Sequence, residues 1–134
     1  MQGLGTASSE GYSGTPSYTL SITETGDAFA NVSSISTIST GIVQGASIPD
    51  QTITFTHATG YPLLYTDISP ANTGVASSTN DTGSQREFPG DGSTGIWGSL
   101  TKITMRQSGN NVEAIFDFSS VMGSSDLSIA VDWD

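Results

Sequence analysis

The feature that most constrains this chain is a strict alternation of apolar and polar side chains in its C-terminal half. The apolar members of the two clearest runs are Val112, Ala114, Phe116 and Phe118, then Leu127, Ile129, Val131 and Trp133. Successive side chains of a β-strand point to opposite faces of a sheet, so each run predicts a half-buried strand. No segment has the 3.6-residue period of an amphipathic helix. The alternation therefore favours an all-β fold.

Weaker runs of the same kind extend this prediction to the rest of the chain. Strands are expected at 18–23, once or twice within 28–43, at 52–57, at 61–68 and at 96–106. The run at 61–68 contains Pro62, which lacks the backbone N–H of a central strand and therefore predicts an edge position. The turn residues at 108–111 predict a hairpin between the strand at 96–106 and the one that follows. The total is about seven short strands.

The length of the chain sets the number of cores. A chain of 134 residues falls within the usual size of one domain with one core. Short strands separated by Gly, Ser, Asn and Pro turns are typical of a single-domain antiparallel β-sandwich or a small β-barrel, and they allow a jelly-roll-like arrangement. The alternation does not distinguish the sandwich from the barrel.

The composition is rich in small hydroxyl side chains and poor in bases. Ser and Thr number 22 and 18, or 40 of 134 residues, whereas charged residues make up 12%. The net charge is −10, and the only basic residues are Arg86, Lys102 and Arg106. Clustered Lys and Arg are needed to bind a phosphate backbone or an anionic membrane surface. We therefore expect neither nucleic acid nor membrane as a partner.

Two polar segments fall outside the expected strands. Residues 1–16 are rich in Gly and predict a flexible N-terminal arm, followed by a single β domain over 17–134. Residues 69–95 predict a polar loop that is long for a compact domain, and such loops are usually functional. We expect both segments to contact a protein partner, with Arg86 and Phe88 as anchors because an aromatic ring and a guanidinium are frequent in binding hot spots. Phe88 could instead pack onto the core.

The sequence contains few residues that could carry out catalysis. It has no Cys, and its only histidine, His57, alternates in phase with Ile53 and Phe55, as a strand residue would. No Gly-x-Ser-x-Gly nucleophile motif is present. We expect no enzyme activity and no cofactor, apart from a weak Ca²⁺ candidate in the polar loop, where oxygen ligands could come from four side chains. These candidates are Asn80, Asp81, Glu87 and Asp91.

Two hypotheses about function follow. The first is a non-enzymatic structural protein of a viral or extracellular assembly, such as a capsid-decorating, cement or tail-associated protein. Its location would be the virion or the extracellular space, its partner a capsid or assembly lattice, and its state a homo-oligomer. The second is a secreted carbohydrate-binding or adhesion module, which would explain the Thr-rich strand face at 52–57 and the polar loop.

Overall fold

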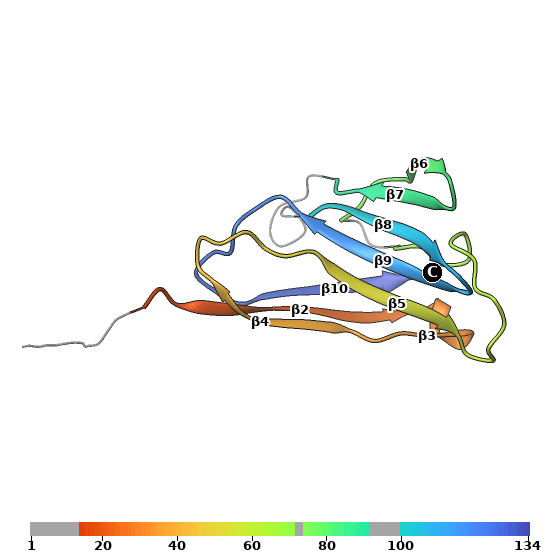
Figure 1. Cartoon of the computed structure of the whole chain (residues 1–134), viewed down its shortest axis with the longest axis horizontal. Helices are drawn as coiled ribbons and strands as arrows, with labels where there is room; N and C mark the ends of the chain where they lie inside the picture. The colour runs from red at the N-terminus through yellow and green to blue at the C-terminus, as the bar shows by residue number, and fades with distance from the viewer. Residues whose placement is uncertain (1–13, 72–73, 92–99) are drawn as a thin grey trace, which may run out of the picture.

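Two β-sheets pack face to face in the computed structural model, which describes residues 14–71, 74–91 and 100–134 (Figure 1). One sheet has three strands in the order β10-β2-β4, and the other has six in the order β3-β5-β9-β8-β7-β6. The fold is thus all-β, as expected, and it is a sandwich and not a closed barrel. The described strands are β2 (Ser17–Gly26), β3 (Val32–Ser33), β4 (Thr37–Val43), β5 (Gln51–His57), β6 (Thr79–Thr82), β7 (Gln85–Pro89), β8 (Leu100–Ser108), β9 (Asn111–Phe118) and β10 (Leu127–Trp133). One 3-10 helix, η1 (Asp27–Ala30), follows β2.

The six-stranded sheet is antiparallel throughout. Its centre is the hairpin of β8 and β9, whose ladder runs from Leu100 opposite Phe118 to Ser108 opposite Asn111. Gly109 in the turn has a φ of 60°, a left-handed conformation that favours glycine. The hairpin expected at 108–111 is therefore confirmed.

The three-stranded sheet contains a parallel pair, which differs from the purely antiparallel arrangement expected. β10 runs parallel to β2 from Leu127 opposite Leu20 to Trp133 opposite Gly26, whereas β4 is antiparallel to β2. The two backbones approach closely at the end of the pair, where a Cβ on Gly26 would collide with the carbonyl oxygen of Trp133. Only glycine fits at this position.

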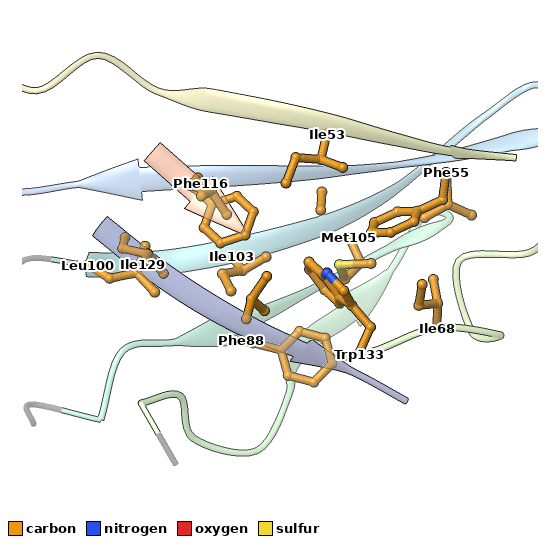
Figure 2. Packing of buried hydrophobic residues seen from close by; sticks show 14 of the residues in the cluster. Ile53, Phe55, Ile68, Phe88, Leu100, Ile103, Met105, Phe116, Ile129 and Trp133 are labelled. Atoms are coloured by element: carbon orange, nitrogen blue, oxygen red, sulfur yellow. The ribbon is translucent and has the colours of Figure 1, made fainter. Parts of the chain in front are cut away.

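The core lies between the sheets and is built from the inward residues of the alternating runs. The buried apolar residues form one cluster, with Trp133 among its largest fully buried side chains (Figure 2). The Trp133 ring meets Phe55 of β5 edge to face at 4.9 Å between centroids, and Phe116 of β9 at 6.1 Å. The strand faces expected at 112–118 and 127–133 are confirmed, because their apolar members point into this cluster.

The segment expected to be a loop at 69–95 contains two strands. β6 and β7 form a hairpin whose turn residues, Gly83 and Ser84, both have positive φ. β7 then pairs along its whole length with β8. Backbone pairing requires no apolar alternation, so a polar strand at the margin of a sheet escapes a prediction based on periodicity.

The opposite correction applies to 61–68, which is a loop and not an edge strand. Its apolar density reflects burial without strand pairing, since Leu63 and Ile68 enter the core. Gln107 of β8 satisfies the loop backbone: its side-chain amide donates to the Leu63 carbonyl at 2.6 Å, and its side-chain oxygen accepts the Tyr65 N–H at 2.8 Å. These bonds replace the ladder that a strand would have formed.

Several expectations lie wholly or partly outside the described residues. They are positions 1–13 of the expected arm, positions 72–73 and 92–95 of the loop expected at 69–95, and positions 96–99 of the strand expected at 96–106. Within the described part of the chain, no helix is long and apolar enough to cross a membrane.

We predict that Trp133→Ala lowers the free energy of unfolding by about 3–5 kcal/mol, because it removes the ring that joins the two sheets. This is a large share of the roughly 5–15 kcal/mol that stabilises a typical domain. Urea denaturation followed by circular dichroism measures the change. The control is Ser128→Ala, an exposed position on the same strand, which should unfold at nearly the wild-type urea concentration. Equal stability of the two variants would contradict the central place of Trp133 in the core.

Candidate functional site

The two residues expected to anchor a partner lie together on β7. Phe88 is only 7% exposed and belongs to the core, so it has little surface to offer to a partner. Arg86 is half-buried, and its guanidinium carbon lies 5.2 Å from the centroid of the Phe88 ring. A cation over an aromatic face is favourable. The pair thus covers one margin of the core.

The four Ca²⁺ candidates are only partly brought together. The Asn80 side-chain amide donates to Glu87 Oε1 at 2.9 Å, and Lys102 Nζ lies 3.2 Å from Glu87 Oε2. Asp81 accepts a hydrogen bond from the Tyr65 hydroxyl at 3.3 Å, and Asp91 follows the end of β7. Among the residues that the structure describes, no three His, Cys, Asp or Glu side chains are grouped so that they could hold a metal ion.

The margins of the two sheets differ in how they are protected against pairing with another chain. Natural proteins protect edge strands by shortness, charge or a covering loop. β3 has two residues, and β6 has four and carries Asp81. The end of β10 is covered by backbone hydrogen bonds to the segment 69–71. β4 has seven residues and, within the described part of the chain, pairs only with β2.

The outer side of β4 exposes apolar side chains. Ile38 is 70% exposed and Val43 45% exposed, while Ile35, just before the strand, is 77% exposed. Ile42 is buried and Thr37 donates a hydrogen bond to Gln51 of the opposite sheet, so these two side chains face inward. Figure 1 shows β4 at the outer side of its sheet. β4 therefore combines an open backbone edge with exposed β-branched residues.

The charge distribution separates this edge from the rest of the molecule. From Ala28 to Pro49 the sequence has no Asp, Glu, Lys, Arg or His, although the whole chain has a net charge of −10. This uncharged segment, 28–49, contains all of β4. The lack of charge in this segment is the sequence signal that could have indicated the β4 edge. The alternation of side chains does not show which strand lies at the margin of a sheet.

A cavity lies where η1, the end of β5 and the loop at 61–68 meet. It is an open cavity of about 450 Å³ lined by Asp27, Ala28, Asn31, Val32, His57, Leu63, Asp67 and Asp134. His57 lies at the end of the inner face of β5, as expected, and its Nδ1 accepts the Thr59 N–H at 3.2 Å. Tyr61, 70% exposed, meets the His57 ring edge to face at 5.7 Å between centroids. The lining of the cavity is thus largely polar, and the exposed Tyr61 ring lies against His57, one of the lining residues.

A partly buried carboxylate lies beside the core tryptophan. The indole N–H of Trp133 donates to Glu24 Oε1 at 2.9 Å, while Oε2 is buried without a hydrogen bond of good geometry. Burial raises the pKa of Glu24 above its ordinary value of 4.5, and the Trp133 bond with the nearby Ser34 and Ser36 hydroxyls offsets only part of this rise. Glu24 therefore ties β2 to β10 and to the segment that leads into β4.

A second acid is perturbed on the six-stranded sheet. Burial raises the pKa of Asp117, and the hydrogen bond and negative charge of Asp50 raise it further. Lys102, opposite Asp117 in the ladder, acts in the reverse direction. Glu87, which accepts from Asn80 and pairs with Lys102, has a lowered pKa. Lys102 thus acts on two acids, of which Glu87 is favoured in its charged form and Asp117 is not.

Comparison with known proteins adds no relative. No protein family model matches the chain, and no curated protein and no solved structure matches it.

We predict that the melting temperature rises when the pH falls from about 8 to about 5. The raised pKa values of Glu24 and Asp117 mean that the folded state binds protons more tightly than the unfolded state. The stability that these two groups contribute is present at low pH, and it is lost as the pH rises through their raised pKa values in the folded state. The lowered pKa of Glu87 acts only below its ordinary value of 4.5, outside this window.

Glu24→Gln keeps an acceptor for Trp133 and removes the buried charge. It should raise the melting temperature at pH 8 by about 2–5 °C and reduce the difference between the two pH values. Differential scanning calorimetry measures both effects. Asp27→Asn, which removes one negative charge from an exposed side chain, is the matched control. If both variants have the same pH dependence as the wild type, Glu24 is not the group responsible.

Proposed function

We propose that this chain is a non-enzymatic structural protein of a large assembly, of the capsid-decorating or tail-associated kind, and that it joins the assembly through β4. The observation that carries the proposal is the open edge of β4 with its exposed Ile35 and Ile38. A free edge strand presents a row of unpaired N–H and C=O groups that can pair with a strand of another protein. Structural proteins of virions and extracellular lattices depend on such repeated contacts.

The chemistry of the edge supports this use. Backbone pairing supplies directed hydrogen bonds, and the exposed isoleucines supply apolar area beside them. An edge of this kind would promote non-specific aggregation in a chain that had no partner for it. The acidic charge on the rest of the surface limits such aggregation, because molecules of like charge repel. The two properties together suit a protein that is soluble when free and bound through one edge when assembled.

The bulge in β4 narrows the part of the edge that can pair. The register with β2 shifts between Tyr18 and Leu20, opposite Ile42 and Ser39, so that β4 carries one extra residue at 40–41. Gly41 there has a φ of 70°. A bulge bends the strand and interrupts its ladder. The part of β4 before the bulge, residues 37–39, together with Ile35 and Ser36 just before the strand, is therefore the proposed contact.

We expect Ile38→Lys to reduce incorporation of the chain into particles by about tenfold or more, because the substitution places a charge in a contact that lacks water. A tagged copy of the chain is expressed in the organism that makes this protein. The lysate and the particles are then fractionated on a density gradient, and the tagged chain is detected in each fraction. Wild-type chain should migrate with large particles. Thr52→Lys, which adds the same charge at an exposed position of β5, should migrate with them as well. Wild-type chain found only at the top of the gradient would refute the proposed function.

A second candidate, a carbohydrate-binding or adhesion module, is favoured by the cavity beside Tyr61. Carboxylates and an amide, from Asp27, Asp67, Asp134 and Asn31, can bond sugar hydroxyls, and an exposed tyrosine ring can stack on a sugar. A glycan array separates the two candidates. Binding that Tyr61→Ala abolishes and Leu64→Ala preserves would favour this module, and an array without signal would leave the structural protein as the better proposal.

A further inference from the structure

The free edge of β4 raises the question of which strand it would accept. We infer that the occupant is the β4 of a second copy of this chain, paired antiparallel about a two-fold axis near residues 35–39. This inference rests on the proposed function, since it names the partner of the same edge. The paired molecules would share one continuous sheet of six strands, three from each copy, with the order β10-β2-β4 repeated in reverse.

The charge of the molecule selects a second copy over a partner of other chemistry. A two-fold interface places the same surface patch of each molecule against itself. Any charged patch would then oppose its own sign, and with a net charge of −10 most of this surface would oppose acid with acid. The uncharged segment 28–49 avoids this repulsion. A basic partner would instead be attracted to the acidic surfaces elsewhere.

The side chains of the edge are compatible with self-pairing. Ile38 points to the outer face of the sheet, and Thr37 and Ile42 point inward. In an antiparallel pair centred within 35–39, the exposed Ile35 and Ile38 of one copy lie near the same segment of the other. Pairs of β-branched side chains across strands stabilise a sheet. No positive or negative side chain of β4 opposes its symmetry mate, because the strand has none.

The other margins are less suited to self-pairing. β3 is two residues long, β6 carries Asp81, and the far side of β10 is occupied in part by the segment 69–71. β4 is thus the longest open margin in the part of the chain that the structure describes. An interface limited to one strand edge and a few isoleucines is small, so the dimer should be weak and depend on concentration.

The first test is sedimentation equilibrium of the full chain between about 1 and 200 µM, the range in which small interfaces associate. Wild-type chain should be a monomer at the low end and a dimer at the high end. Ile38→Lys should weaken the dimer by about tenfold or more, because it places two like charges at the axis. Thr52→Lys, on the outer face of the other sheet, should dimerise as the wild type does. Circular dichroism confirms that each variant is folded.

The second test uses the absence of cysteine in the wild-type chain. Single-cysteine variants at each position from 36 to 39, with Thr54→Cys as a control, are oxidised at high concentration. Antiparallel neighbours across a two-fold axis have Cα atoms about 4.5–5.5 Å apart, which a disulfide can span. We expect one position to cross-link strongly and its neighbours weakly, which also gives the register. If Thr54→Cys cross-linked equally well, the disulfides would form through random collision of molecules and not through strand pairing, and the inference would be overturned.

The outcomes separate this inference from the proposed function. Wild-type chain that stays monomeric at 200 µM, yet enters particles unless Ile38 is replaced, refutes the second copy as partner and leaves the proposed function supported. Chain that dimerises through β4 but enters no particle supports the inference about the edge and refutes the assembly role. Dimerisation that Ile38→Lys leaves intact places the interface elsewhere and overturns the inference.

Discussion

The packing of Trp133 between the two sheets is the interaction on which the rest of this structure depends. From β10 its ring reaches Phe55 and Phe116 of the six-stranded sheet, while its indole N–H bonds Glu24 of β2. This geometry requires β10 to lie directly beside β2, in the parallel pair that ends at Gly26. Because β10 takes one side of β2, β4 takes the other side and becomes the margin of its sheet. A core contact thus determines which strand of the molecule is left open to a partner.

The distribution of charge then favours β4 as the strand that contacts another molecule. The acids of the chain all lie outside the uncharged segment 28–49, and some of them are paired, as Asp117 is with Asp50 and Glu87 with Lys102. The uncharged segment that contains β4 is therefore less repulsive toward a second copy than the acidic parts of the surface. Hydrophobic area and free backbone groups occur at the same place, since Ile38 lies on β4 and Ile35 just before it. The proposed assembly contact and the proposed self-pairing both follow from this coincidence.

The alternation of side chains predicted the class of fold and the inward faces of β9 and β10, because burial on one face leaves a direct period in the sequence. It failed for β7, which is held by backbone pairing to β8, and for 61–68, where Leu63 and Ile68 are buried in a loop supported by Gln107. Of the site, the sequence indicated Phe88 as a possible core residue but not the open edge, since a margin depends on the order of strands in space. The cavity likewise joins Asp27, His57 and Asp134, which are distant in the sequence.

The central claim is that β4 is the contact surface of the assembled protein, and hydrogen exchange followed by mass spectrometry tests it most directly. Backbone amides on the open side of β4 have no ladder partner in the isolated chain and exchange quickly there. The account predicts that peptides covering 35–43 exchange more slowly in the concentrated or particle-bound protein. Peptides covering β5 and β6 should exchange at the same rate in both states. The account would be contradicted if peptides from other strands became protected while peptides covering 35–43 still exchanged at the rate of the isolated chain.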